Sequence, residues 1–442
     1  MNIKEKILTE INKNEQNIFG LFAFLDEYTR IFSKMDSIEQ DNEYFKVYPK
    51  NFFEDFNYEI YKEDYNIAIN NLKNIENILT GIPENANIIF SINGYYSEQH
   101  SKIISKNIDI INITNKSNND YFEEKKQFVD LYYGENENQL SILNNLLSKN
   151  GIYINIAPNS IIAEPIYLLN VITELYDNYF INSKKIIKVE KNSKINVIEI
   201  GSIFSKFNTI YSELCSIDLK ENANVNYSKL HSNTNNITNK TTYFENYNYK
   251  LDKNSNLNIN TIALGRDYNK NDTLIKLEGD NATLNDSYFI LTNNDKIVDL
   301  KTTIYHKAQN TTSNQLVKAV ANGNSKIYFD GKIIIKDNTE QSSAMQNSKA
   351  ILLSDNAKVQ FQPQLEIYND DIKAKHGSAI GNLDADLLFY LKTRGIDEDI
   401  AKKLLLVAFA NDIINESYIN DEFKNNIVNL IINENYTSIK SS

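Results

Sequence analysis

The sequence predicts a mainly β protein, with a parallel β-helix or a close relative at its centre and a helical domain on each side. Three observations indicate this: apolar residues at helical spacing in the first third, a recurring turn-then-strand unit in the middle, and capped apolar helices at the end. They divide the 442 residues into an N-terminal helical (α+β) domain over 1–150, a β-helix core over 151–383 and a C-terminal helical domain over 384–442.

The first domain begins with apolar residues four apart, Ile3, Ile7 and Ile11, which is typical of a surface helix with one buried face. The same spacing predicts helices in "SEQHSKIIS" (97–105) and in "NENQLSILNNLLSKNG" (136–151). Directly before the first of these segments, "NANIIFSINGYY" (85–96) predicts a strand that ends in an Asn-Gly turn. This region contains no catalytic motif.

From Gly151 onward, β-branched runs alternate with short polar turns, and one unit recurs. It has a charged residue or glycine, then Asn, a small residue, a polar residue and an aliphatic residue that opens a strand. Asn tolerates the left-handed backbone of a tight corner, so a roughly constant period indicates stacked coils with strands of four to six residues. An all-β sandwich with Asn-rich hairpins is the alternative. The Asn positions are 192, 222, 254, 281, 324 and 356, with steps of 30, 32, 27, 43 and 32.

Two capped helices and a third follow Leu383. Asp384 and Asp397 are expected N-caps, and Gly395 is expected to end the first helix. The first helix is expected to bury Leu387, Leu388 and Leu391, and the second Leu404, Leu405, Ala408 and Ile413. The third helix is "NDEFKNNIVNLIINE" (420–434). Three short helices with apolar faces are expected to dock on the β-helix, on a partner, or on both.

Composition excludes several classes of partner. The net charge is −12 with only three arginines, which argues against nucleic acid. No apolar run reaches the roughly 18 residues of a membrane span, and the N-terminus does not resemble a signal peptide. With a single cysteine the chain can form no internal disulfide. We therefore expect a cytoplasmic protein, or an organellar one whose leader has been removed.

Most residues that could carry chemistry have a structural interpretation. No nucleophile elbow, Cys/His metal spacing or nucleotide-binding P-loop occurs, so we expect no enzyme. Cys215 is expected to be a buried inert thiol. His100 and His231 lie in polar stretches and are expected on the surface, whereas His306 at a strand end is expected to be structural. Glu366 alternates with apolar neighbours and is expected on a solvated strand face.

His376 lies between a strand and the first C-terminal helix and is followed by Gly377, which allows close approach of another chain. A neutral imidazole is a suitable ligand for iron, zinc or copper. From residue type alone, an ordinary loop histidine remains the alternative.

The stretch from Gln346 to Ile396 resembles the SufB/SufD scaffold family of iron–sulfur cluster assembly. Its elements Q-x-x-x-x-L-L-S-D-x-A, P-Q-L-E-I, D-D-I-K, H-G, L-D-x-x-x-L-F-Y-L and R-G-I occur in family order, and residues 306–335 and 143–169 match more weakly. The His-Gly pair resembles SufD-type members, because SufB-type members tend to carry H-E-A where this chain has His376, Gly377 and Ser378.

The resemblance implies a right-handed parallel β-helix between two helical domains. It also implies a SufB-like paralogue paired through the β-helix, an SufC-like ABC ATPase docked on the C-terminal helices, and a possible homodimer of the chain alone. His376 matches the histidine at the SufB interface, where a transient iron–sulfur cluster would form. SufD-type sequences often have cysteine two residues earlier; here Ala374 cannot ligate, so thiolates must come from the partner.

Two other functions stay open at this stage. A purely structural or binding β-solenoid would need no ATPase. A carbohydrate lyase would need clustered carboxylates and a basic residue, and Arg266 is the only arginine within the predicted coils.

Overall fold

The computed structural model describes residues 58–61, 79, 81–112, 138–147, 151–173, 175, 177–205, 207–232 and 241–433. The helix predicted at Ile3, Ile7 and Ile11 lies outside these residues. The division at 150 and 383 stays a prediction, although described strands within 1–150 join the same sheets as the later strands.

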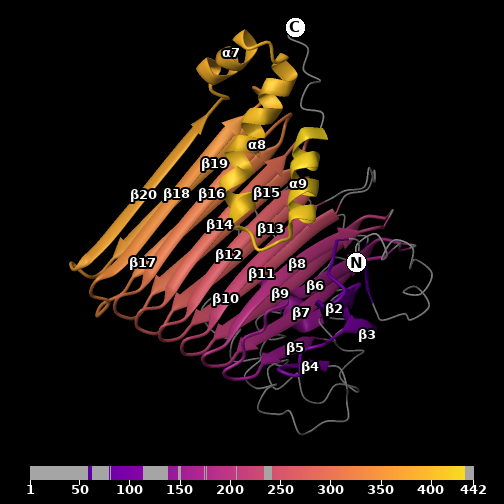
Figure 1. Cartoon of the computed structure of the whole chain (residues 1–442), viewed down its shortest axis with the longest axis vertical. Coiled ribbons are helices and arrows are strands. Elements are labelled where there is room, and N and C mark those ends of the chain that lie inside the picture. The colour runs from indigo at the N-terminus through magenta and orange to yellow at the C-terminus, as the bar shows by residue number, and fades with distance from the viewer. Residues whose placement is uncertain are drawn as a thin grey trace.

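The described strands form two ten-stranded sheets, and from β5 onward successive strands alternate between the two sheets (Figure 1). The first sheet, sheet A, contains β1 (Glu59–Ile60), β4 (Ile108–Asn112), β5 (Ile152–Ile156), β7 (Tyr179–Val189), β9 (Thr209–Leu219), β11 (Thr241–Leu251), β13 (Tyr268–Leu277), β15 (Ile297–His306), β17 (Lys326–Ile335) and β19 (Lys358–Ile367). The second, sheet B, contains β2 (Asn87–Ile92), β3 (Tyr95–Lys102), β6 (Ile166–Ile172), β8 (Lys194–Ile203), β10 (Asn224–Ser232), β12 (Asn256–Leu264), β14 (Thr283–Thr292), β16 (Thr312–Ala321), β18 (Ser342–Leu352) and β20 (Ile372–Gly381).

From β5 and β6 onward each strand pairs in parallel with the strand one coil away, for example β16 with β14 and β18. The predicted parallel β-helix is therefore confirmed, and the hairpin sandwich is excluded. The predicted strand length is wrong: from β7 onward the strands have nine to eleven residues. Each coil has only two strands, so about 30 residues are divided between two long strands and two corners.

Asparagines form a ladder at one corner, where the chain passes from sheet A to sheet B. Asn192, Asn222, Asn254 and Asn281 have φ between 55° and 61°, as predicted. The side-chain Nδ2 of each of these residues donates to the side-chain Oδ1 of the asparagine one coil earlier, at 2.8 to 3.1 Å, and Asn159 is the first acceptor. Asn159 and Asn310, which lie outside the predicted unit, occupy the same corner and also have left-handed φ values, 59° and 56°.

The last two predicted corner residues, Asn324 and Asn356, do not belong to this ladder. Both lie at the opposite corner, after strands of sheet B, and neither has a positive φ. At the first of these turns Gly323 takes the left-handed conformation, with φ +65°. The irregular step of 43 residues therefore marks a jump from one corner of the coil to the other.

We expect Asn254→Ala to lower the free energy of unfolding by about 1–2 kcal/mol, because alanine would be held at a left-handed φ and two ladder hydrogen bonds would be lost. Asn356→Ala is the matched control, since Asn356 is exposed and lacks positive φ. Urea denaturation of both variants measures the difference. Equal stability of the two would contradict a structural role for the ladder.

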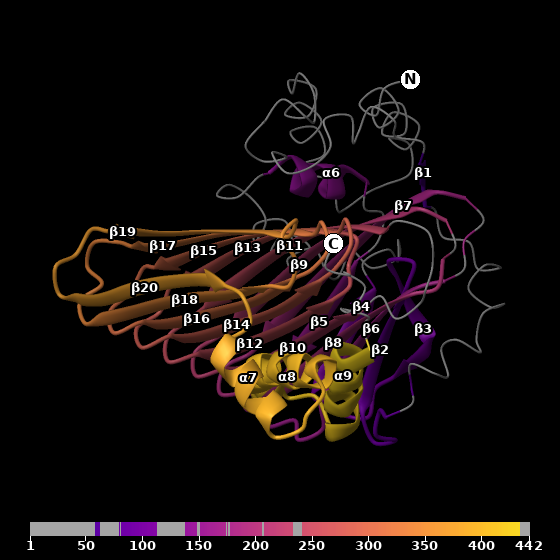
Figure 2. The same ribbon diagram turned by 90° about the horizontal axis from the view of Figure 1, so that it is seen from above.

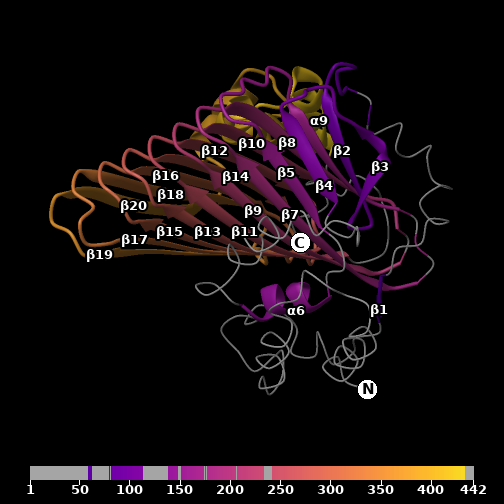
Figure 3. The same cartoon turned by 90° about the horizontal axis from the view of Figure 1, so that it is seen from below.

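Four described helices flank the sheets: α6 (Gln139–Leu147), α7 (Ala385–Thr393), α8 (Glu398–Glu416) and α9 (Asp421–Asn433). Figures 2 and 3 show α6 on the outer side of sheet A and the three C-terminal helices on the outer side of sheet B. The predicted helix over 97–105 is wrong. Asn93 and Gly94 have φ of 50° and 84° and turn the chain into β3, which pairs antiparallel with β2.

Sheet B contributes to two apolar layers, one on each of its faces. The interior core lies between the sheets and contains, near the asparagine corner, aliphatic residues such as Val225 and Leu251 from both of them. The second layer joins the outer face of sheet B to α8 and α9, where Ile262 and Phe289 pack with Leu406, Ala410 and Ile413. Two polar contacts fix the same helix, because the Lys318 ammonium pairs with Asp412 and the Asn260 amide donates to the Ile413 carbonyl.

The caps of the C-terminal helices are as predicted, but their buried faces are not. Asp384 accepts from the backbone N–H groups of Asp386 and Leu387, and Asp397 accepts from that of Asp399. No residue of α7 is buried, and α8 buries Ile413 but leaves Leu404 and Ala408 exposed. The reason is that α8 turns a neighbouring stripe toward sheet B: Ala401, Leu406, Ala410, Ile413 and Ile414.

The two ends of the solenoid differ. At one end β3 and β4 pair antiparallel with β2 and β5 and complete the sheets. At the other end β19 and β20 are the last strands of sheets A and B, and each pairs on one side only within the described residues (Figure 1). No described helix is long and apolar enough to span a membrane.

Candidate functional site

His376 lies on β20, the terminal strand of sheet B, and its side chain is exposed. It is therefore a strand residue at the open end of the solenoid, not a loop residue. Its partner in the parallel register is Gln346 on β18. A Cβ added to Gly377 would meet no atom within 4 Å, so the backbone beside the histidine is open to solvent.

The strand alternation places His376 on the interior face of its sheet. Ile372 and Ala374 have the same parity on β20 and pack against the interior core. On β18 the partner Gln346 is buried, whereas the flanking Met345 and Asn347 are exposed. The imidazole therefore lies at the mouth of the space between the two sheets, where a further coil would stack.

The chain alone offers few metal ligands at this mouth. Among the described residues, no three His, Cys, Asp or Glu side chains are grouped to hold a metal ion. Ala374, two residues before His376 and on the same face, has no donor atom. Within the part of the chain that the structure describes, His376 is the donor side chain that the inner face of β20 presents at this mouth.

The interior of the middle coils contains buried charges that the sequence analysis did not identify. The guanidinium Nη1 of Arg266 lies 2.7 Å from Glu245 Oε2, and the ring of Tyr243 stacks on it with 3.8 Å between Cζ and the ring centroid. Burial alone would raise the pKa of Glu245, but the charge of Arg266 holds it well below its usual range. Arg266 is thus engaged in an internal ion pair and is not available as a surface base.

A second buried group consists of one ammonium between two carboxylates. The Lys185 Nζ lies 2.9 Å from Glu199 and 2.6 Å from Glu213, and all three side chains are almost fully buried. One positive charge cannot neutralise both acids. Lys185, together with a hydrogen bond from Tyr227, lowers the pKa of Glu199 to about 2, whereas burial raises that of Glu213 to about 7.

We expect Glu213→Gln to stabilise the protein more at pH 8 than at pH 5. The folded carboxyl keeps its proton to about pH 7, while the unfolded one loses it near its ordinary pKa. The free energy of unfolding of the wild type should therefore fall by up to about 3 kcal/mol as the pH rises from the pKa of the unfolded carboxyl to that of the folded one. Glutamine does not titrate, so the variant lacks this loss. Denaturation at both pH values measures it, with Glu366→Gln as the surface control. If variant and wild type differ in free energy of unfolding by the same amount at pH 5 and at pH 8, the pKa of Glu213 is not raised.

The other predicted residues have mixed outcomes. Cys215 is fully buried on β9, and burial raises the pKa of its thiol, as expected of an inert cysteine. His306 is structural, as predicted: its ring nitrogens bond the hydroxyls of Thr311 and Ser313, and burial lowers its pKa to about 4. Glu366 is half-exposed and pairs with a surface lysine, which confirms its solvated face.

Two histidine predictions are wrong in whole or in part. His231 is not on the surface; it is buried on β10 with its Nδ1 3.8 Å from Glu245, and burial together with Arg266 lowers its pKa to about 3. His100 is half-buried on β3 and shares a hydrogen bond with Ser97. Side chains alternate between the two faces of a strand. Glu213 and His231 lie an even number of residues from inward apolar residues of their own strands, so this alternation could have predicted that they are buried.

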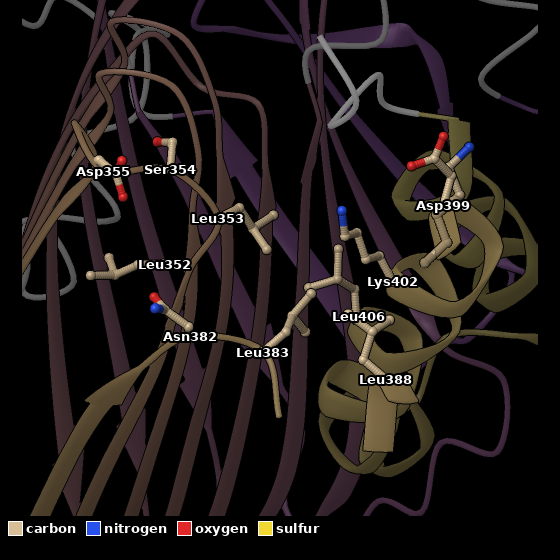
Figure 4. Close-up of a pocket in the computed structure, with 11 residues that line it drawn as sticks. Leu352, Leu353, Ser354, Asp355, Asn382, Leu383, Leu388, Asp399, Lys402 and Leu406 are labelled. Carbon is tan, nitrogen blue, oxygen red and sulfur yellow. The ribbon is translucent and has the colours of Figure 1, made fainter. Parts of the chain in front are cut away.

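A second candidate surface lies on the C-terminal helices. Their outer side exposes large apolar side chains at 46–68% of their area: Leu387, Phe389, Tyr390, Ile400 and Leu404, together called the α7–α8 patch. Figure 4 shows a neighbouring pocket between the last coil and these helices, with Leu353 and Leu383 on one side and Leu388, Lys402 and Leu406 on the other.

Comparison with known proteins gives a consistent assignment. The model of the family described as "SUF system FeS cluster assembly, SufBD core domain" matches residues 173–409. The iron–sulfur cluster assembly protein SufD of Escherichia coli K12 is 29% identical over 153 residues, which are 35% of this chain and 36% of that protein. The SufD proteins of Plasmodium berghei and Bacillus subtilis are 26% and 23% identical over 69% and 63% of this chain.

These alignments cover 23% of the Plasmodium protein and 63% of the Bacillus protein, so the chain spans less than two thirds of each of the three relatives. The family model, in contrast, covers more than half of the chain and includes β7 to β20, α7 and part of α8. The chain therefore belongs to the SufBD core family of the SUF system for iron–sulfur cluster assembly.

Proposed function

We propose that this chain is a non-catalytic scaffold subunit in iron–sulfur cluster assembly, and that His376 contributes one ligand to a cluster forming between two subunits. The observation that carries the proposal is the position of His376: exposed, on the inner face of the terminal strand, at the open end of the solenoid. A transient cluster would be the cargo of this site, with its thiolates supplied by the partner because Ala374 supplies none.

The partner would be a SufB-like paralogue that binds the open end. Among the described strands, none pairs with the outer edge of β19 or of β20, which favours addition of strands from another chain. The open space beside Gly377 fits the close approach of such a strand. A homodimer through the same edges would be the arrangement of the chain alone.

The α7–α8 patch would be the docking surface for a SufC-like ABC ATPase. Exposed apolar side chains gathered on two short helices are typical of a protein-binding surface. Nucleotide-driven movement of the ATPase would then reach the terminal coil, because α7 follows β20 after only three residues.

Co-expression with SufB-like and SufC-like chains tests the proposal. We expect one complex that co-purifies with all three chains and contains iron and sulfide after reconstitution. A structural solenoid without a role in cluster assembly predicts no stable ATPase partner. Purification of the chain without either partner, from a lysate that contains both, would refute the proposed scaffold function.

We expect Phe389→Asp to reduce recovery of the ATPase about tenfold or more, because a buried unpaired carboxylate in an apolar interface costs several kcal/mol. Phe389 is 68% exposed, so the chain itself should fold as before. Tyr418→Asp is the control: Tyr418 is also exposed, at 45%, but follows α8 at its far end. Equal recovery of the ATPase with both variants would show that it does not bind the α7–α8 patch.

A further inference from the structure

Three buried polar side chains form a hydrogen-bonded row on successive strands of sheet B. The Gln315 Nε2 on β16 donates to Asp286 Oδ2 on β14 at 2.8 Å, and the Gln346 Nε2 on β18 donates to Gln315 Oε1 at 2.7 Å. All three are 1–3% exposed. The strand register continues the row from Gln346 directly to His376 on β20.

The carboxylate gives this row a direction. An ionised Asp286 only accepts hydrogen bonds, so the Gln315 amide must turn its nitrogen toward Asp286 and its oxygen toward Gln346. Gln346 must then donate to Gln315, which leaves its own Oε1 free. Among the described residues, this buried Oε1 has no hydrogen-bond partner.

The facing sheet leaves room for this arrangement. Gly331 on β17 lies opposite Gln346, and a Cβ built there would be 2.2 Å from the Gln346 Nε2. Any larger residue at position 331 would displace the amide. The end of the row is thus a buried acceptor, fixed by its neighbours, on the residue that the strand register pairs with the exposed His376.

We propose that Gln346, oriented by Gln315 and Asp286, is a positioning residue that accepts the N–H of one ring nitrogen of His376. A neutral imidazole that donates from one nitrogen carries its lone pair on the other, so the row fixes which nitrogen can bind metal. This inference rests on the proposed function of His376 as a ligand. It gives a partner to the buried amide oxygen that is otherwise unpaired in the coil next to the open end.

The test is the tautomer of His376 in the full-length chain without metal. The chain has four histidines, so nitrogen-15 labelling of histidine gives a simple NMR spectrum, assigned with His376→Ala. At pH 8 the Asp286 carboxyl is ionised, since burial raises its pKa only to about 6. We expect about a three- to tenfold preference for one tautomer, the effect of one hydrogen bond.

Gln346→Met, which keeps the length but removes the acceptor, should reduce the preference to that of a free imidazole. Gly331→Ala should act like Gln346→Met by displacing the amide, which provides a second measurement if Gln346→Met does not fold. The buried His306, held by two hydroxyls, is the internal reference and should not change.

The same tautomer ratio in wild type and Gln346→Met would overturn the inference. The result is independent of cluster assembly, because the measurement uses the isolated chain. If His376→Ala assembled clusters normally, the proposed function would fail while the tautomer measurement still decided the role of Gln346.

Discussion

Replacement of His376 by alanine is expected to lower the iron and sulfide content of the co-expressed complex by about tenfold or more, as loss of a ligand does at metal sites. Among the described residues no three His, Cys, Asp or Glu side chains are grouped to hold a metal ion, so none of these groups could replace the lost imidazole. The variant should fold and assemble normally, because the side chain is exposed and loses no buried contact.

The matched control is Lys375→Ala, one residue earlier on the same strand. Lys375 is also exposed but has the opposite parity, so its side chain lies on the outer face of β20. We expect this variant to keep wild-type iron and sulfide. Full cluster content in an intact His376→Ala complex would show that the imidazole is not a ligand.

Arg266→Met is expected to lower the free energy of unfolding by about 3–5 kcal/mol, because it leaves Glu245 as a buried charge without its main partner. The two side chains are 4% and 3% exposed, so water cannot replace the guanidinium. Methionine also loses the stacking of the cation on Tyr243. Urea denaturation at pH 7 measures the loss.

Arg394→Met is the control, since Arg394 is exposed on the C-cap of α7 and the same change should cost less than about 0.5 kcal/mol there. Adding Glu245→Gln to Arg266→Met should recover part of the stability, because it removes the unpaired charge. A loss below about 1 kcal/mol for Arg266→Met would mean that the ion pair contributes little beyond the packing of the residues around it.

The ion pair also bears on the lyase alternative. A lyase would need a basic residue that reaches a substrate, and Arg266 is buried and bound to Glu245. The interpretation that listed Arg266 as a candidate base rested on residue type alone. Sequence could not show that the side chain turns inward, because a corner residue such as Arg266 has no strand parity from which to infer its direction.

The C-terminal helices show a similar limit. Asp384 and Asp397 were identified as caps because capping depends on a residue and its next few neighbours. The buried face of α8 was not, because nearly every turn of "IAKKLLLVAFA" offers apolar residues and several stripes are equally apolar. Contact with sheet B selected the stripe that contains Leu406 and Ala410 and left Leu404 exposed.

The sequence by itself determined the parallel coils, the asparagine corner and the helix caps, and it singled out His376. The coils, the asparagine corner and the caps depend on local backbone preference and on a period of about 30 residues, both of which can be read from the order of the residues. Only the tertiary structure decided that each coil has two long strands, that Arg266 turns inward to pair with Glu245, and that Gln346 ends a polar row one strand from His376. Those features depend on which residues of distant coils share a face, and stacking alone sets that register.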